Sequence, residues 1–273
     1  MSQALDPALE TILFPTTASP KNSTARMQLA LSKSLDTALD LLFPPHCASC
    51  QAALPADSNK ALCRSCAQRV HWIGSDRCQR CGDASGQGAG VMHDCPSCRT
   101  HPPVFVHSAC TVARYAEGPL RQLILALKFG HKLHIVKLFG ALIAQRVQAT
   151  NLALPEMIVV PAPVTRTTLY SRAFNQSEEI ASCAARRLSL PLVTGLLKKI
   201  RHTPPQATLT HEERRQNLKN AFACDAKVAS RYKDRPVLLV DDVITTCATI
   251  SECARTLNAV GLGEIRAAAI ARG

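Results

Sequence analysis

The apolar positions of this chain change their spacing along its length, and each spacing indicates a different kind of element. In the C-terminal part, amphipathic stretches with a helical repeat alternate with short, continuously apolar stretches typical of buried strands. The pattern predicts helices at 119–129, 133–147, 176–188 and 248–260, and strands at 104–115, 157–160, 236–243 and 264–270. Because strands alternate with helices, residues 104–273 are predicted to form an α/β domain around a parallel sheet.

The N-terminal part lacks this regularity. Residues 1–28 mix Pro, Ser, Thr, Ala and Asn without periodicity, which predicts a disordered tail. Residues 29–45 are predicted to form a lead-in helix that the pair Pro44-Pro45 ends. This prediction depends on leucines that recur at helical spacing: Leu31, Leu35, Leu39 and Leu42.

Cysteine dominates the segment from 46 to 101. Eight of the thirteen cysteines lie there as four CxxC pairs, and the two pairs of each group are 12 and 13 residues apart. A CxxC turn presents two sulfurs on one side, and two such turns close a tetrahedral site for Zn²⁺. We therefore predict a double zinc ribbon with two structural Zn²⁺ sites, while the spacing leaves an interleaved pairing open. The sequential pairing uses Cys47, Cys50, Cys63 and Cys66 for one site and Cys78, Cys81, Cys95 and Cys98 for the other.

A disulfide scaffold is the alternative interpretation of these cysteines, and the start of the chain argues against it. Asp6, Pro7 and Glu10 interrupt the N-terminus, so it does not resemble a signal peptide. No apolar run approaches the roughly 20 residues needed to cross a bilayer. We therefore expect a cytoplasmic protein without membrane insertion, in which clustered cysteines bind metal.

The positive net charge of the chain indicates which kinds of ligand it could bind. The formal net charge is +12, and residues 186–235 hold twelve Lys or Arg against four Asp or Glu. Such a run is either a solvated face or a surface for a polyanion, such as a ligand with several phosphates or single-stranded DNA. Aromatic residues make up 4% of the chain, which argues against a recognition surface built on stacked rings.

The sharpest motif is the junction between the strand at 236–243 and the helix that follows it. The strand carries the adjacent carboxylates Asp241 and Asp242 near its end, and a hydroxyl-rich loop at 245–249 leads into the helix. Ligands bind at the carboxyl ends of parallel strands, and a helix N-terminus favours phosphate. Because paired carboxylates accept hydrogen bonds from vicinal hydroxyls, the motif indicates a site for a ribose and its phosphate.

Three other interpretations fit this motif less well. A response-regulator receiver carries its Asp pair on its first strand, whereas only 31 residues follow Asp242 here. Helix capping explains one carboxylate but not two before a Thr-Thr loop. A dinucleotide-binding fold is disfavoured because no G-x-G-x-x-G follows a strand.

The junction resembles a known signature. Residues 237–249 are similar to the 5-phosphoribosyl-1-pyrophosphate (PRPP) signature of type I phosphoribosyltransferases. Further segments, in the same order along residues 35–273, resemble the ComF family of competence proteins. They are Leu42-Phe43-Pro44-Pro45 before the first CxxC, Leu127-Lys128-Phe129, Val159-Val160-Pro161-Ala162-Pro163-Val164 with Arg166 and Arg172, Ala173-Phe174-Asn175-Gln176, and Arg201, Thr203 and Gln206 followed by Arg214, Arg215, Asn217, Asn220, Ala221 and Phe222.

The resemblance implies a type I phosphoribosyltransferase-like parallel sheet flanked by helices, preceded by the small double zinc ribbon. It also implies PRPP with Mg²⁺ as ligand and an association with DNA uptake in natural transformation, so single-stranded DNA and DNA-uptake proteins are expected partners. Two functions stay open. The protein either transfers a 5-phosphoribosyl group to an acceptor or is a non-catalytic accessory that senses PRPP or binds single-stranded DNA.

The resemblance also assigns roles to single residues. Asp241 and Asp242 would hold the ribose hydroxyls, directly or through Mg²⁺, and with Arg172 they are the candidate catalytic residues. The 5′-phosphate would lie in the loop Thr245, Thr246, Cys247, Ala248 and Thr249. The pyrophosphate loop would be Pro161, Ala162 and Pro163, with charge neutralised by Arg166, Arg172 and Arg201. Lys128 either joins these cations or is a solvated residue at a helix end.

Two positions depart from the family pattern, which has glycine where this chain has Ala173 and Cys247. If Cys247 takes a positive φ, the strain costs roughly 1–2 kcal/mol. Its thiol is either a small buried substitute for glycine or, near a helix N-terminus, a reactive group with a lowered pKa.

Overall fold

The computed structural model describes residues 6–14, 45–55, 59, 61–86, 90–93, 95–130, 132, 134–201 and 216–273. The predicted lead-in helix, apart from Pro45, and most of the predicted tail lie outside these residues. The tail prediction is wrong for one stretch, because Pro7–Leu13 form helix α1. The Asp6 side chain caps this helix by accepting a hydrogen bond from the Ala8 N–H, and Leu13 is fully buried.

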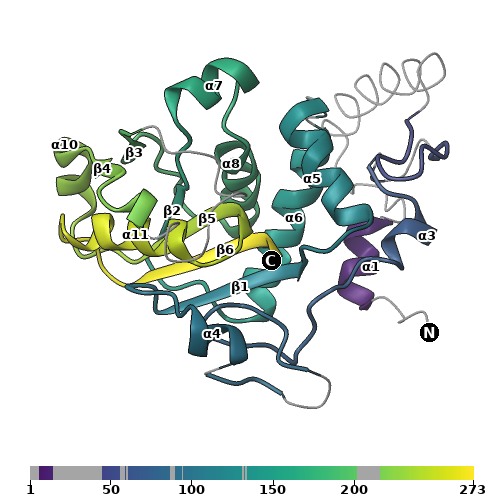
Figure 1. Cartoon of the computed structure of the whole chain (residues 1–273), viewed down its shortest axis with the longest axis horizontal. Helices are drawn as coiled ribbons and strands as arrows, with labels where there is room; N and C mark the ends of the chain where they lie inside the picture. The colour runs from purple at the N-terminus through teal and green to yellow at the C-terminus, as the bar shows by residue number, and fades with distance from the viewer. Residues whose placement is uncertain are drawn as a thin grey trace, which may run out of the picture.

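A four-stranded parallel sheet forms the centre of the α/β domain, as the alternation of elements predicted (Figure 1). Its spatial order is β1-β6-β5-β2. The strands are β1 (Ser108–Arg114), β2 (Ile158–Pro161), β5 (Val237–Ile244) and β6 (Ile265–Arg272). Because β2 runs parallel to β5 with Pro161 opposite Val240, the segments that follow these two strands leave the sheet at the same edge.

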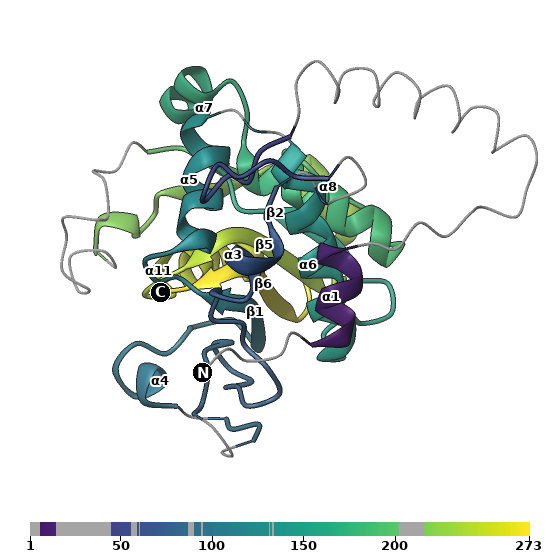
Figure 2. The ribbon, with the colours of Figure 1, turned by 90° about the vertical axis from the view of Figure 1, so that its right-hand side faces the viewer.

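The four long predicted helices are present, and several short elements join them (Figures 1 and 2). The long helices are α5 (Pro119–Gly130), α6 (His134–Ala149), α8 (Gln176–Leu188) and α11 (Ala248–Asn258). The short elements, which periodicity did not predict, are α3 (Arg64–Ala67), α4 (Pro96–Thr100), α7 (Arg166–Arg172), α10 (Ala226–Ala229), the 3-10 helix Ser230–Tyr232, and the antiparallel pair β3 (Leu197–Lys199) and β4 (Phe222–Cys224).

The two faces of the sheet are buried by different elements. Along β5, Leu238 and Val240 belong to one apolar cluster, while Val237 and Leu239 belong to another, as the two-residue repeat of a strand requires. The first cluster includes apolar residues of α1, α5, α6 and α8, and the second includes those of α11.

The cysteine-rich region covers the outer edge of β1. Trp72 forms an antiparallel bridge with Ala113, and the Ile73 N–H donates to the Val112 carbonyl over 2.9 Å. The Arg114 N–H in turn donates to the His71 carbonyl, also over 2.9 Å. These bonds pair backbone groups of β1 on the side away from β6, its neighbour in the sheet.

None of the helices that the structure describes is long and apolar enough to cross a membrane.

Candidate functional site and metal centres

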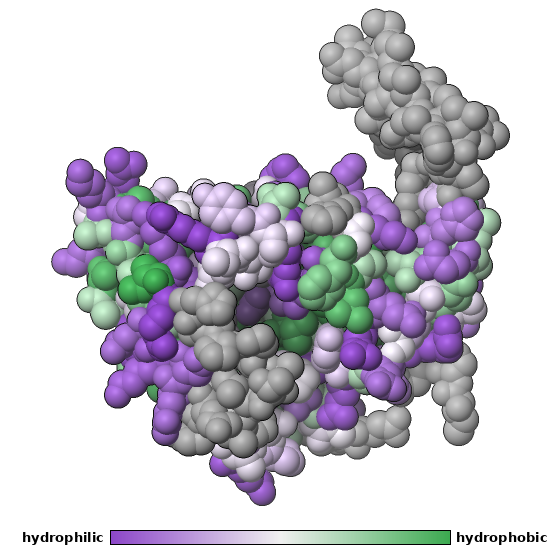
Figure 3. All heavy atoms as spheres, turned by 45° about the horizontal axis from the view of Figure 1, so that its top comes forward, coloured by the Kyte–Doolittle hydropathy of each residue, from purple (hydrophilic) through white to green (hydrophobic). Residues whose placement is uncertain are grey.

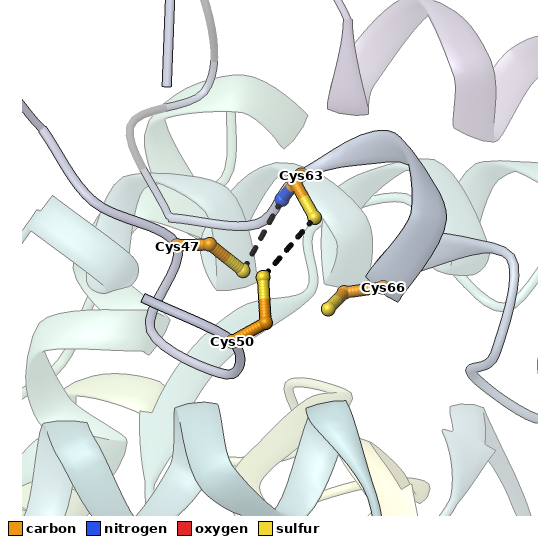
Figure 4. A group of neighbouring side chains, drawn as sticks. All are labelled: Cys47, Cys50, Cys63 and Cys66. Atoms are coloured by element: carbon orange, nitrogen blue, oxygen red, sulfur yellow. Dashed lines mark hydrogen bonds between the residues drawn. The ribbon is translucent and has the colours of Figure 1, made fainter. Parts of the chain in front are cut away.

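Four sulfurs from the first two CxxC pairs converge on one point (Figure 4). Two of them, Cys50 Sγ and Cys63 Sγ, are 3.7 Å apart, and the Cys63 N–H points at Cys47 Sγ over 3.4 Å. Sulfurs at the corners of a tetrahedron around zinc are about 3.8 Å apart, given Zn–S bonds of about 2.3 Å. The set Cys47, Cys50, Cys63 and Cys66, here called the first zinc centre, therefore fits Zn²⁺.

The remaining pairs form a second group of the same kind. Cys78 Sγ lies 3.7 Å from Cys98 Sγ, and Cys81 Sγ lies 3.5 Å from Cys95 Sγ. All four residues are buried, and we call them the second zinc centre. The sequential pairing of the cysteines is confirmed over the interleaved one, and two tetracysteine sites that fit Zn²⁺ precede the α/β domain.

The two carboxylates of β5 are tied to the neighbouring helices α5 and α8. Lys128 Nζ of α5 lies 2.6 Å from Asp242 Oδ2, and Gln176 of α8 donates to the same oxygen over 3.4 Å. The Ser177 hydroxyl donates to Asp241 Oδ1 over 2.9 Å. Lys128, for which the sequence left two alternatives, is thus paired with Asp242, and its side chain is 21% exposed.

The carboxylate pair is electrostatically strained. Burial, and then the neighbouring charge of Asp242, raise the pKa of Asp241 to about 7 from its ordinary 3.8. The ionised form of a carboxyl group with a raised pKa is stabilised by any ligand that brings positive charge or hydroxyl donors to it. The pair is therefore suited to a metal-bound or hydroxyl-rich ligand.

The loop between β5 and α11 has the backbone that a phosphate cradle needs. Cys247 caps α11 in the left-handed region, with φ 59° and ψ 0°. Thr246 Oγ1 is buried and has no hydrogen-bond partner among the described residues. An orphaned hydroxyl beside a helix N-terminus fits an anionic group that would accept its hydrogen bond.

The two departures from the family pattern occupy backbone positions that favour glycine. Ala173, which ends α7, has φ 62°, close to the 59° of Cys247. The Cys247 side chain is 2% exposed, and burial raises the pKa of its thiol to about 11. A small buried side chain therefore stands at this position, and burial works against the lowered pKa that a reactive thiol would need.

A cavity of about 640 Å³ opens beside the carboxyl end of β2. Pro161, Pro163 and Arg166 line it from one side, and the strand β3 with Arg201 lines it from the other. The Arg201 guanidinium donates to the carbonyls of Asn217 and Lys219, at 2.7 and 2.9 Å, so part of its hydrogen-bonding capacity serves the chain itself.

Two other predicted residues, Ala162 and Arg172, do not line this cavity. Ala162 is buried, and its carbonyl accepts a hydrogen bond from the Asn175 side chain over 3.1 Å. Arg172 stacks over the ring of the exposed Phe129, with 4.9 Å to the ring centroid. Turned by 45° so that the top of Figure 1 comes forward, the coloured surface of the molecule is mainly hydrophilic, with apolar patches of which one lies beside a hollow (Figure 3).

The end of the loop faces a second cavity of about 730 Å³. Thr246 and Ala248 line it together with residues of α11 and of the 100–105 segment. The structure thus gathers Lys128, Asp241 and Asp242 in one group. Pro161 and Pro163, which were predicted to form the pyrophosphate loop, line one cavity, whereas Thr246 and Ala248 line a separate one.

Sequence reasoning missed several residues of this region. Ser177 donates a hydrogen bond to Asp241, and its signal was its place two residues after the Asn175 cap of α8. Lys199 lines the first cavity, and burial lowers its pKa. Arg272 donates to the carbonyls of Ile244 and Thr245 from the last strand, and its basic side chain at the end of an apolar strand was the signal.

Comparison with known proteins places these features in a class. Residues 38–99 match the model of the double zinc ribbon domain, and residues 175–273 match that of the phosphoribosyl transferase domain. The chain is therefore a phosphoribosyltransferase-type α/β protein that carries a double zinc ribbon.

Whole-chain relatives narrow this to one family. Competence protein F of Haemophilus influenzae is 31% identical over 234 residues, which cover 84% of this chain and 98% of that protein. The DNA utilization protein YhgH of Escherichia coli K12 is 30% identical over 231 residues, covering 83% and 96%. YhgH of Salmonella typhi is also 30% identical, over 230 residues with the same coverage. The chain belongs to the competence protein F (ComF) family.

Proposed function

We propose that this protein binds PRPP with Mg²⁺ at the carboxyl edge of its sheet. The observation that carries the proposal is the arrangement around β5, where the paired carboxylates Asp241 and Asp242 precede a left-handed turn at the N-terminus of α11. Carboxylates next to such a turn suit a sugar that carries both vicinal hydroxyls and a phosphate.

The 5′-phosphate is assigned to the loop 245–249. The backbone N–H groups at the start of α11 and the orphaned Thr246 hydroxyl are donors for its oxygens. The left-handed turn at Cys247 bends the chain at this position.

The ribose hydroxyls are assigned to Asp241 and Asp242, directly or through Mg²⁺. Oxygen ligands of this kind are those that Mg²⁺ prefers, and the metal would supply charge neutralisation for the pyrophosphate. Lys128 offsets the charge of Asp242 over 2.6 Å, so ligand binding exchanges this cation for a hydroxyl or a metal ion.

The pyrophosphate is assigned to the first cavity, of about 640 Å³. Arg166 and Lys199 line it, and both Pro161 and Pro163 are at its wall. Cations placed there would stabilise the negative charge that develops as the bond between C1 and pyrophosphate breaks.

Transfer of the phosphoribosyl group is the first candidate activity. A second candidate is a binding role toward single-stranded DNA. Although the low aromatic content of the chain argued against a surface of stacked rings, two exposed rings on α5 and α7 favour this role. Tyr170 is 87% exposed and Phe129 is 64% exposed, and Arg172 covers the latter. Rings and guanidinium groups of this kind stack on unpaired bases.

The biological setting is proposed from the relatives. Their names tie them to competence and to DNA utilization. We infer that this chain acts in the cytoplasm on incoming DNA or on nucleotides derived from it, together with other DNA-uptake proteins.

Calorimetric titration with PRPP and Mg²⁺ tests the binding proposal. Asp241→Asn combined with Asp242→Asn should abolish Mg²⁺-dependent binding, because both oxygen pairs lose their charge. The matched control is Asp234→Asn. Asp234 is exposed, precedes β5 and has φ 60°, so this variant should bind PRPP with the affinity of the parent protein. Equal affinity in the double variant and the parent would refute the PRPP site.

Pyrophosphate release separates the two candidate activities. Release that requires both PRPP and an added acceptor supports transfer, whereas binding without release supports the accessory role. Loss of single-stranded DNA binding in Phe129→Ala, with PRPP affinity unchanged, would support the stacking surface.

A further inference from the structure

The second zinc centre packs against the loop to which we assign the 5′-phosphate. Its four cysteines belong to the same apolar cluster as Cys247 and Ala248. In contrast, Cys47 and Cys66 of the first zinc centre belong to the cluster with α1, α5 and α6 on the other face of the sheet. The two centres therefore have different neighbours, and only the second one touches the cluster of the proposed phosphate site.

One side chain connects the second zinc centre with this loop. Arg272 of β6 is 5% exposed, and its Nη1 donates to the carbonyl of Ile244 over 3.2 Å and to that of Thr245. Nη1 also donates to the Gly273 carbonyl, whereas the buried Nε has no hydrogen-bond partner among the described residues. The charges of Cys247, Cys81 and Asp83 outweigh the effect of burial and raise the pKa of the guanidinium, so Arg272 lies near the second zinc centre. The Asp83 carboxylate also accepts a hydrogen bond of 2.6 Å from the Ser97 hydroxyl. In the sequence, Ser97 stands between the zinc-ligand cysteines Cys95 and Cys98.

The charge of Arg272 fits a metal-loaded centre. A guanidinium stays protonated in proteins, and burying it without a counter-charge is costly. Four thiolates around Zn²⁺ carry a formal charge of about −2, so they offset this buried cation. Groups in contact with metal ligands typically change metal affinity about 10- to 100-fold when they are removed.

We infer that Arg272 is a positioning residue that couples metal binding at the second zinc centre to the shape of the phosphate-binding loop. The part of this inference that concerns PRPP rests on the proposed function. When the centre is loaded, its thiolates hold the guanidinium in place, and the guanidinium fixes the carbonyls of Ile244 and Thr245. Coupling of this kind is reciprocal, so a ligand in the loop also retains the metal.

The first zinc centre offers a matched control. Arg69, which is exposed, donates from Nη2 to Cys66 Sγ over 3.0 Å. Arg69 is thus an arginine next to a zinc-ligand sulfur, but in the centre whose Cys47 and Cys66 belong to the cluster on the opposite face of the sheet. The pair Arg272→Met and Arg69→Met therefore separates coupling to the loop from a general weakening of zinc binding.

The test measures zinc release to a chromogenic chelator together with PRPP affinity. Arg272→Met should speed release of one of the two zinc ions about tenfold or more and weaken PRPP binding about tenfold. Arg69→Met should speed release of the other zinc ion and leave PRPP affinity unchanged. In the parent protein, saturating PRPP with Mg²⁺ should slow release of the zinc ion that Arg272→Met affects.

Several results would overturn the inference. Unchanged PRPP affinity in a folded Arg272→Met protein, or equal acceleration of both zinc ions, would show that Arg272 does not couple the two places. If Arg272→Met does not fold, Arg272→Lys retains the charge but loses the planar fork, and the same two measurements apply to it. If the parent protein does not bind PRPP, the proposed function fails, while selective zinc release in Arg272→Met still tests the contact with the second zinc centre.

Discussion

At the scale of single residues, the molecule carries side chains at backbone positions that favour glycine. Cys247 and Ala173 both have a φ near 60°, and the sequence alone identified both positions from the ComF pattern. The strain expected at Cys247 depended on a positive φ, and the structure has this φ. The contacts of Ser177 and Arg272 could not be predicted, because they join residues 64 and 27 or 28 positions apart in the chain.

Replacing Cys247 by glycine should tighten PRPP binding. Glycine adopts the left-handed turn without the roughly 1–2 kcal/mol that a Cβ costs, which corresponds to an affinity gain of about 5- to 30-fold. Titration calorimetry measures this gain. Ser189→Gly relieves a similar φ of 55° at the end of α8 and should leave the affinity unchanged. Weaker binding in Cys247→Gly would mean that the loop has adapted to the thiol.

The raised pKa of Asp241 predicts a pH-dependent stability. Its folded pKa of about 7 exceeds the ordinary value of 3.8, so the folded state holds a proton that the unfolded chain loses as the pH rises from about 4 to 7. The stability contributed by this group is therefore lost over that range. Asp241→Asn should be more stable than the parent by at least about 1 kcal/mol at pH 8, with little difference near pH 4.

Thermal unfolding of the two proteins from pH 4 to pH 8 measures this trend. Asp234→Asn again serves as the control and should show no such trend. A constant difference in melting temperature between Asp241→Asn and the parent would contradict the raised pKa.

At the scale of elements, the sequence predicted long elements well and short ones poorly. The helices α5, α6, α8 and α11 each present several apolar positions at a repeat, so their pattern is visible in the sequence. Helix α1 has seven residues with Leu9 and Leu13 as its buried contacts, which is too short a stretch to show a repeat. Its position is fixed by packing against distant parts of the chain.

Leu13→Ala should test the importance of α1. Leu13 is fully buried, and removing a buried leucine side chain costs about 2–5 kcal/mol in unfolding free energy. Thr11→Ala on the exposed side of the same helix should cost much less. Chemical denaturation measures both, and equal effects would mean that α1 does not pack as the structure has it.

The zinc ribbon should lose one metal ion when one of its ligands is replaced. The parent protein should contain about two zinc ions per chain, and Cys63→Ser about one, since serine binds zinc poorly in place of a thiolate. Cys183→Ser, outside the CxxC pairs, should retain two. Elemental analysis decides this, and fewer than about 1.5 zinc ions in the parent would argue against two filled centres.

At the scale of the whole molecule, the order of the domains was predictable, but their contact was not. The CxxC spacing indicated two metal sites, yet nothing in the spacing placed them on opposite faces of one sheet. The carboxylate pair was identified from the apolar strand that carries it. The division of the surrounding space into two cavities depends on loops whose positions are set by tertiary contacts.

The bridge between Trp72 and Ala113 has a consequence for how the protein aggregates. A bare outer strand exposes unpaired N–H and C=O groups that recruit strands from other molecules. In this chain the cysteine-rich region occupies that position on β1, so it shields the sheet against self-association. Stripping the zinc should therefore lead to intermolecular β-aggregation and precipitation before the α/β domain itself melts, and limited zinc supply would become a limit on solubility.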